Sequence, residues 1–523
     1  MRKSIFNAVA TLSFFSILDR ALGFFFKIYL SYQLGAAALG TYQVALSFFF
    51  VLLTVTTSGI PLVVGKLTAK YRRENKLKSE RSLTTAALIL GLILAAVITV
   101  AVFLLRKPLS GMFADPKSVN ALLLLLPALL FSAVYSAFRG NLWGRQRYFA
   151  VSVVEIVEQV VRILFCIAMI TLGFHGLYMT ALSLSVGCLI SALACTLVFL
   201  KNKGALANPK GQLIPLLKSS APITVSRAAS SIINSLVAIV VPFLLIKTGH
   251  TSEQAMALFG SSIGMALPLL YIPITVVGSL AFVLIPTVST SAAAGDLKGV
   301  NRQIESAIGF ATVFAALFVP MFLSLGKPIG LLVYNNEVAG EFLSASAWLL
   351  IPLAIENITS SVMNSLDLEM KSFFNCLIGS GAMFILFFCF YGNFPITLLS
   401  VGMGISWLIA SVLHILCIKK KTGLKFGYIP KLVKSVIVVI PAAFLTVWLH
   451  NLMGALPIAA SILIAAVVSL IFYAALALVF GLIDFDFFKT KVKVSKHGNP
   501  KKPERKAISK KPVSPLEQVK NQT

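Results

Sequence analysis

Charged residues are scarce in this sequence, and acidic residues are scarcer than basic ones. Only 12% of the 523 residues are charged, against 58% that are hydrophobic, and 18 Asp and Glu stand against 45 Lys and Arg. A water-soluble domain of this size could not bury so much apolar surface, so the composition excludes that class of protein. The connections between the apolar runs are short, which excludes an inserted soluble catalytic domain.

Cysteine is also rare and shows no paired spacing. The six cysteines lie within or at the ends of apolar runs, which predicts neither a disulfide framework nor a metal knuckle. We expect no metal and no cofactor. These cysteines are Cys166, Cys188, Cys195, Cys376, Cys389 and Cys417.

Apolar runs of about 20 residues recur along the chain, each long enough to cross a hydrocarbon core of about 30 Å as a helix. They predict an all-α polytopic membrane protein with about fourteen spans. Asp19-Arg20 interrupts the first run and no small-residue cleavage site follows, so we expect that run to be retained as a span. The expected spans lie near 7–33, 39–64, 83–105, 119–138, 149–172, 177–200, 219–246, 259–289, 303–325, 342–365, 372–392, 395–418, 435–450 and 457–482.

The basic residues are distributed unequally between the two sides of these spans. About 36 of the 45 Lys and Arg fall at the N-terminus, in the even-to-odd connections and in the C-terminal tail, and about five fall in the opposite loops. This asymmetry predicts that both termini are cytoplasmic. It also explains the net charge of +27 without nucleic acid, which we do not expect as a partner.

A weak internal duplication predicts how the spans are grouped. Leu125-Leu126-Pro127 and Leu350-Ile351-Pro352 are related by an offset of 225 residues, which fits two six-helix lobes with a substrate path between them. We expect an N-terminal lobe over 1–200, a cytoplasmic linker over 201–218, a second lobe over 219–418 and two extra helices over 435–482. Residues 485–523, rich in Lys and Pro, are expected to form a disordered cytoplasmic tail that adheres to anionic lipid or docks a partner.

Four basic residues remain inside the expected spans: Arg20, Lys27, Arg162 and Arg227. Each costs a few kcal/mol or more at mid-bilayer unless it faces water, a counter-charge or an anionic ligand. Lys27 follows Arg20 by seven positions and lies near the same helix face. Either both face an anionic ligand, or Asp19 pairs locally with Arg20 while Lys27 extends outward to the interface.

The roles of the other charged residues inside the expected spans can be interpreted in more than one way. Arg227 lies in a stripe of Ser and Asn in the seventh span, which has no acidic residue, and is expected to converge with the arginine of the first span on the central path. Glu155, Glu158 and Arg162 share one face of the fifth span, either as an ion-paired polar seam or as a cation or proton site at Glu155. Glu356 in the tenth span is either a coupling carboxylate or part of a hydrogen-bonded helix interface.

Several motifs resemble one known group of membrane proteins. Asp19-Arg20-Ala21-Leu22-Gly23-Phe24, Leu39-Gly40-Thr41-Tyr42, Ser58-Gly59-Ile60-Pro61 and Glu158-Gln159-Val160-Val161-Arg162 are similar to segments of the stage V sporulation protein B group. This group lies in the polysaccharide-flippase branch of the multidrug/oligosaccharidyl-lipid/polysaccharide exporter superfamily. The resemblance is most specific over about the first 300 residues.

The resemblance implies two six-helix lobes around a cationic V-shaped cavity, two extra C-terminal helices, and flipping of undecaprenyl-linked sugars such as the peptidoglycan precursor. It places Arg20 at the position of a cavity arginine, and Lys27 near that of a second basic residue. It further implies the bacterial cytoplasmic membrane as location, a lipid-linked saccharide and membrane lipids as ligands, and cell-wall synthesis proteins as partners.

We therefore expect a non-enzymatic flippase that works by alternating access in cell-wall or spore-cortex synthesis. Arg20, Lys27 and Arg227 would pair with the diphosphate, and a bound cation or the membrane potential would drive transport. The alternatives are a multidrug or cation antiporter of the same superfamily, a membrane glycosyltransferase, and a non-transporting scaffold for cell-wall assembly.

Overall fold

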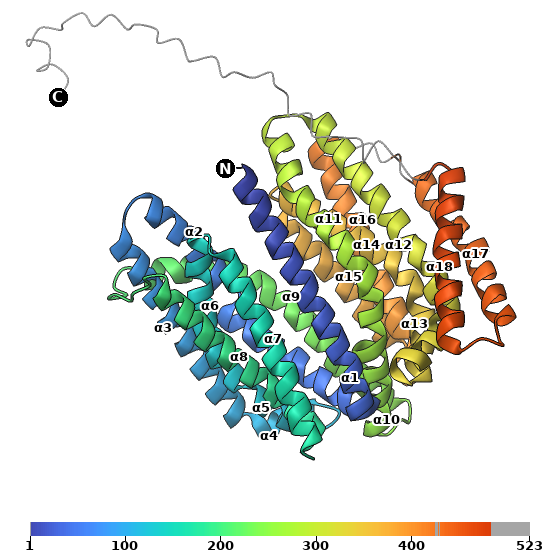
Figure 1. The fold of residues 1–523 in the computed structure, drawn as a ribbon, viewed down its shortest axis with the longest axis horizontal. Helices are drawn as coiled ribbons and strands as arrows, with labels where there is room; N and C mark the ends of the chain where they lie inside the picture. The colour runs from blue at the N-terminus through green and yellow to red at the C-terminus, as the bar shows by residue number, and fades with distance from the viewer. Residues whose placement is uncertain (1, 424–426, 428, 483–523) are drawn as a thin grey trace, which may run out of the picture. The chain divides into compact units, whose positions relative to one another are not determined.

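A computed structural model describes residues 2–423, 427 and 429–482, and all regular structure within these residues is helical (Figure 1). The all-α prediction is confirmed. The helices are α1 (Arg2–Thr57), α2 (Ile60–Arg73), α3 (Leu77–Leu104), α4 (Arg106–Met112), α5 (Lys117–Leu125), α6 (Pro127–Gly144), α7 (Tyr148–Thr171), α8 (Gly176–Lys201), α9 (Leu213–Lys247), α10 (Ser252–Phe259), the π-helix η1 (Gly260–Ala266), α11 (Leu267–Ala293), α12 (Leu297–Tyr334), α13 (Glu337–Ser346), the 3₁₀-helix η2 (Ala347–Leu349), α14 (Leu350–Ser365), α15 (Glu369–Cys389), α16 (Thr397–Thr422), α17 (Ile429–Leu452) and α18 (Ile458–Val479).

The long helix α1 bends sharply at Gly35. This residue has φ 72° and ψ 172°, a backbone conformation that only glycine adopts without strain. The two arms on either side of the bend correspond to the first two expected spans. The second arm is continued by α2, which begins after Gly59 and has a proline in its first turn, where no backbone N–H is needed.

Twelve described helical segments are long and apolar enough to cross a membrane. The fourteen expected spans exceed this number for two physical reasons. The first segment, Phe14–Arg73, bends at Gly35 and covers two expected spans. The other reason is α7, which has 24 residues but carries Glu155, Glu158 and Arg162 near its middle, so that every 18-residue stretch of it contains three charges. The fourteen expected spans thus each correspond to a helical segment.

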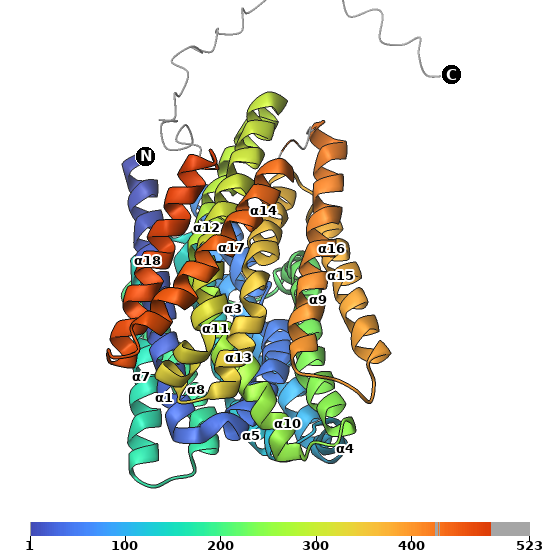
Figure 2. The same cartoon turned by 90° about the vertical axis from the view of Figure 1, so that its right-hand side faces the viewer.

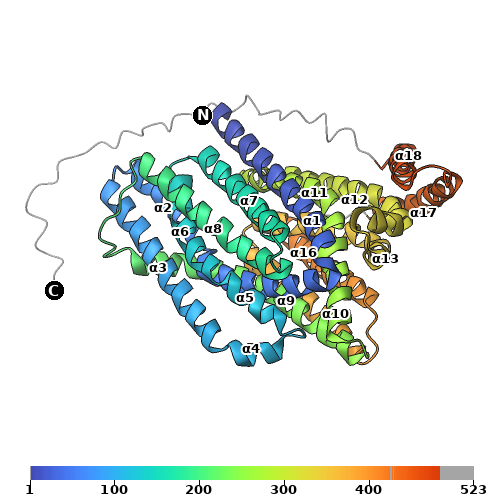
Figure 3. The same ribbon diagram turned by 60° about the horizontal axis from the view of Figure 1, so that its bottom comes forward.

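The helices pack in two groups joined by α1. In one group α6 contacts α2, α3 and α8, and α7 packs on α8; in the other, α14 contacts α11, α12 and α16, and α15 packs on α16. Figure 3 shows the blue and green helices of the first group apart from the yellow α12 and α13. The final pair α17 and α18 lies against α12 (Figure 2). The boundaries 1–200, 201–218, 219–418 and 435–482 stay predictions, and the expected tail over 485–523 lies outside the described residues.

The second arm of α1 meets α10 and η1 backbone to backbone. A Cβ atom added at Gly40 would lie 2.0 Å from the carbonyl oxygen of Met256, and one added at Gly260 would lie 2.0 Å from that of Ala36. Only glycine permits so close an approach. Nearby, the Ser252 hydroxyl donates a hydrogen bond of 2.7 Å to the carbonyl oxygen of Ala114. This end of the helix bundle is therefore closed by direct contact between the two groups.

Candidate functional site

Arg20 lines a cavity of 370 Å³ between α1, α11 and α14, which we call the Arg20 cavity. The arginine side chain is exposed, and polar groups of α11 and α14 lie across from it. The other lining residues are Tyr271, Ile274, Thr275, Gly278, Ala281, Ile285, Leu353, Asn357 and Ser361.

Lys27 lines a second cavity of 440 Å³, the Lys27 cavity, which adjoins the first because Tyr271 and Leu353 line both. Residues of α1, α9, α10, η1, α11, α14, α15 and α16 form its walls. They combine amides and hydroxyls, from Gln43, Ser47, Asn234, Ser380 and Ser406, with large apolar side chains that include Phe259, Met383, Met403 and Trp407.

The charged residues that line the two cavities are cations. Each cavity has one, Arg20 or Lys27, and no carboxylate is among the described lining residues of either. The expected alternative, a local pair between Asp19 and Arg20, is not formed: no ion pair joins Asp19 to any cation in the part of the chain that the structure describes. The cavities therefore combine positive charge with apolar and hydrogen-bonding surface.

Arg227 is not among the residues that line either cavity. Its side chain is exposed on α9, and its Nη1 donates a hydrogen bond of 3.4 Å to the carbonyl oxygen of Ser58, just beyond the end of α1. One helical turn away, the hydroxyls of Thr54 and Ser231 are 3.0 Å apart. Arg227 thus lies at the contact between α1 and α9, the first helices of the two predicted lobes.

Arg139 lies inside a helix and not in a connection. The predicted fourth span, 119–138, leaves Arg139 in the connection that follows it, but α6 continues to Gly144 and contains this residue. Arg139 forms an ion pair with Glu155 of α7 and lies 4.2 Å above the ring of Trp143. The Tyr135 hydroxyl donates to the same carboxylate at 3.1 Å. Glu155 therefore takes its counter-charge from α6, and not from Arg162 on its own helix.

Arg162 and Glu158 do not pair, although they are separated by one helical turn. Arg162 donates from Nη2 to the hydroxyl of Tyr42 at 3.1 Å and lies 5.3 Å above the ring of Phe26. The Cys188 thiol lies 3.7 Å from Glu158 Oε1. Within the described residues no carboxylate lies within ion-pair distance of Arg162. The expected polar face of α7 exists, but its charges contact neighbouring helices.

Glu356 belongs to a polar cluster that its sequence neighbours do not indicate. The Cys376 thiol lies 3.8 Å from Glu356 Oε1 and 4.0 Å from Nε2 of His414. His414 is fully buried in α16 and contacts the hydroxyls of Thr359 at 3.2 Å and Ser372 at 3.1 Å. Its signal in the sequence is a histidine in the middle of an apolar run. We found no group of His, Cys, Asp and Glu able to hold a metal ion among the described residues.

The two cavities can accommodate a ligand that is both anionic and apolar. A guanidinium and an ammonium supply charge-assisted donors for phosphoryl oxygens. Amide and hydroxyl groups supply neutral hydrogen bonds, and the methionine and aromatic side chains supply apolar contact. A small organic cation finds no carboxylate on these walls among the described lining residues.

The sequence of this chain is similar to those of known proteins. Residues 6–291 match the sequence model of the family described as polysaccharide biosynthesis protein. The chain is 24% identical to stage V sporulation protein B of Bacillus subtilis (strain 168) over 390 residues, which cover 71% of this chain and 75% of that protein. It is also 24% identical to lipid II flippase MurJ of the same strain over 337 residues, covering 58% of this chain and 61% of that one.

A solved structure shares the architecture. The lipid II flippase MurJ in an inward closed conformation superimposes with a TM-score of 0.71 and 13% sequence identity, covering 91% of this chain and 99% of that structure. The likeness extends over nearly all the described helices and establishes a common fold.

Proposed function

The chain belongs to the polysaccharide biosynthesis protein family, and from this premise we propose that it is a flippase for a lipid-linked saccharide. The observation that carries the proposal is the pair of adjoining cavities with Arg20 and Lys27 on their walls and no lining carboxylate among the described residues. A diphosphate between a prenyl chain and a saccharide combines the negative charge, apolar surface and hydrogen-bonding groups that such walls match. The relatives named above support the same class of substrate.

We propose an undecaprenyl diphosphate carrier, moved from the inner to the outer leaflet of the bacterial cytoplasmic membrane for cell-wall or spore-cortex synthesis. Arg20 and Lys27 pair with the diphosphate, and Arg227 guides it at the contact between α1 and α9. No bond is made or broken, so the protein acts without enzymatic chemistry. Alternating access requires that the contact between Gly40 and Gly260 separates to release the saccharide.

Transport needs a driving force, for which we propose the membrane potential or a coupled cation. Moving one charge through 100 mV is worth about 2.3 kcal/mol. Glu356, and the Glu155 and Glu158 face of α7, are the carboxylates available for coupling, and Asp19 lies beside Arg20. Cell-wall synthesis proteins are proposed as partners that use the delivered saccharide.

The test is a lipid-flipping assay with the purified protein in proteoliposomes. Arg20→Gln and Lys27→Gln are each expected to reduce the flipping rate at least about tenfold, because each removes one charge-assisted contact to the diphosphate. Arg227→Gln is expected to reduce it less. Arg302→Gln, which removes an exposed cation outside both cavities, is the matched control.

Wild-type flipping by both Arg20→Gln and Lys27→Gln would exclude the cationic-cavity mechanism. Efflux of ethidium by the wild-type protein, without flipping of any lipid-linked saccharide, would instead establish the antiporter alternative.

A further inference from the structure

A second basic pocket lies away from the two central cavities, where the ends of α2, α6 and α8 meet. Its volume is 260 Å³, and it is lined by Arg72, Arg145, Gln146, Arg147 and Asn202. None of these residues lines the Arg20 or Lys27 cavity. Three of the five carry guanidinium groups, so the pocket concentrates positive charge.

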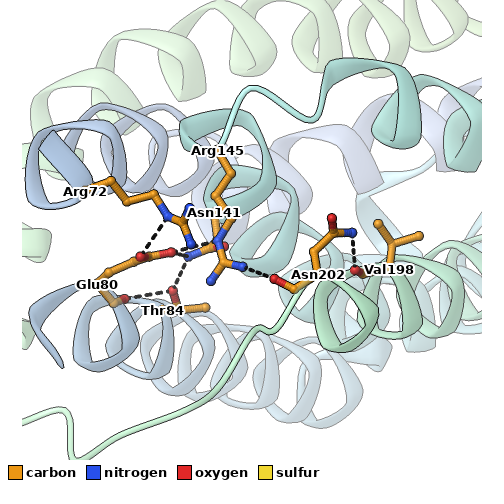
Figure 4. Close-up of polar contacts among 7 residues, drawn as sticks. All are labelled: Arg72, Glu80, Thr84, Asn141, Arg145, Val198 and Asn202. Carbon is orange, nitrogen blue, oxygen red and sulfur yellow. Dashed lines mark hydrogen bonds and ion pairs between the residues drawn. The ribbon is translucent and has the colours of Figure 1, made fainter. Parts of the chain in front are cut away.

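One buried carboxylate organises two of these arginines. Glu80, which is 1% exposed, accepts from Nε of Arg72 at 2.9 Å and from Nε of Arg145 at 2.7 Å (Figure 4). The Asn141 amide donates to the same carboxylate at 3.1 Å and to the Thr84 hydroxyl at 2.9 Å. The positions of Arg72 and Arg145 are therefore fixed before any ligand binds.

The single negative charge of Glu80 does not neutralise the positive charge of the pocket. Glu80 bonds each of the two arginines through Nε, and Arg145 Nη1 donates to the carbonyl oxygen of Asn202 at 2.8 Å. In the described part of the chain no second carboxylate pairs with Arg72 or Arg145, and none pairs with Arg147. Three guanidinium groups thus face one carboxylate, and the terminal N–H groups of Arg72 remain available for an anion.

The electrostatics of Arg145 agree with this charge excess. Burial lowers the pKa of the Arg145 guanidinium most strongly, Glu80 opposes that shift, and the charges of Arg72 and Arg81 lower the pKa further. Arg145 lies just beyond the end of the membrane-spanning segment Lys117–Gly144. An added anion would stabilise its charged form.

The pocket also lies where three apolar helical segments of membrane-spanning length end. Arg145, Gln146 and Arg147 follow directly after the segment Lys117–Gly144, and Asn202 follows directly after Gly176–Lys201. Arg72 is the second-last residue of Phe14–Arg73. All five lining residues are therefore at the ends of apolar segments, where a bilayer presents its phosphate groups.

We propose that this pocket binds the phosphodiester headgroup of an anionic phospholipid. Arg72 and Arg147 donate to the phosphoryl oxygens from the open side, while Arg145 supports the site through Glu80 and Asn202. A planar guanidinium suits this ligand because it offers paired donors to two phosphoryl oxygens.

The experiment measures the melting temperature of the full chain in phosphatidylcholine nanodiscs as phosphatidylglycerol is added. The proposal expects a saturable rise for the wild-type protein. Arg147→Gln is the informative variant, because Arg147 is exposed and has no part in the Glu80 network. It is expected to need at least about tenfold more phosphatidylglycerol for half of the rise.

Arg73→Gln is the matched control, since it removes the neighbouring exposed arginine, which does not line the pocket. It is expected to change the midpoint less than about twofold. Equal shifts in the two variants, or a rise that never saturates, would show only general attraction to an anionic surface and overturn the proposal. A saturable rise with inorganic phosphate but not with phosphatidylglycerol would assign the pocket to a soluble anion instead.

Discussion

The arginines beside Glu80 and the cations of the central cavities differ in how their charge is balanced. Arg145 is 5% exposed and pairs with a carboxylate that is 1% exposed. Arg20 and Lys27 line open space, and neither forms an ion pair within the described residues. Glu80 holds α2, α3 and α6 together through its pairs with Arg72 and Arg145, whereas the cations of the central cavities have no such partner among the described residues.

This difference has an energetic meaning. A cation removed from water is stable only when a counter-charge or a set of hydrogen bonds replaces its hydration. The Glu80 network supplies that replacement from the chain itself. In the cavities no carboxylate among the described lining residues supplies it. If the proposed function is right, substitutions in the two regions should therefore affect different properties, stability in one and transport in the other.

The largest expected effect on stability follows removal of the buried carboxylate. Glu80→Gln leaves the buried Arg145 without its counter-charge and is expected to lower the free energy of unfolding by about 3 kcal/mol. Denaturant unfolding of the purified protein in detergent measures this. Glu74→Gln, in the exposed pair with Lys76, is the control and should have no measurable effect.

A double variant sharpens the interpretation. Glu80→Gln combined with Arg145→Met removes both buried charges and is expected to recover at least half of the lost stability. If the double variant is as unstable as Glu80→Gln alone, the loss arises from packing around residue 80, and the charge-balance interpretation is wrong.

In the cavities, the expected effect falls on transport. Lys27→Met keeps the length and apolar contacts of the side chain but removes its charge. Because Lys27 has no counter-charge within the described residues, stability should stay within about 0.5 kcal/mol of wild type or rise. Flipping should fall at least about tenfold. Lys247→Met, at the end of α9, is the matched control for both measurements, and a large loss of stability in Lys27→Met alone would show that Lys27 is structural.

The sequence predicted the spans well because their signal is local. A run of about 20 apolar residues is sufficient to indicate a membrane helix, and each of the fourteen expected spans corresponds to a helical segment. The predicted ends of the spans were less accurate, because the helices continue beyond the apolar runs. This is why Arg139, five residues before the end of α6, was assigned to a connection.

Pairing of charges was predictable only in part, because it depends on neighbouring helices. The spacing of Glu158 and Arg162 suggested a contact along α7, but Arg162 contacts Tyr42 of α1. Glu80 lies in a strongly basic segment and would be expected in solvent. It is buried because α6 brings Asn141 and Arg145 onto it, and no spacing within residues 66–81 indicates this. Arg20 and Lys27 could be identified from the sequence as candidate cavity residues because they are cations inside apolar runs.

The ion pair between Arg139 and Glu155 is less buried than the pair between Arg145 and Glu80, but its cation has a counter-charge, unlike Arg20 and Lys27 in the described part of the chain. Its side chains are 29% and 33% exposed, whereas those of Arg145 and Glu80 are 5% and 1% exposed. We expect a coupling energy of about 1 kcal/mol from a double-mutant cycle with Arg139→Gln and Glu155→Gln, measured by denaturant unfolding. Zero coupling would show that Arg139 is held mainly by its contact with Trp143, and normal flipping in Glu155→Gln would exclude Glu155 as a coupling site.

The smallest effect on stability is expected for Glu356, a carboxylate that has no cation partner within the described residues. Glu356→Gln preserves the shape of the side chain and an oxygen that accepts from the Cys376 thiol. Unfolding free energy should therefore change by less than about 0.5 kcal/mol. Flipping measured from pH 5 to pH 8 then separates the two roles left open for this residue. A coupling carboxylate requires the variant to lose transport or its pH dependence, whereas a wild-type profile would leave Glu356 as part of the interface between α14 and α15.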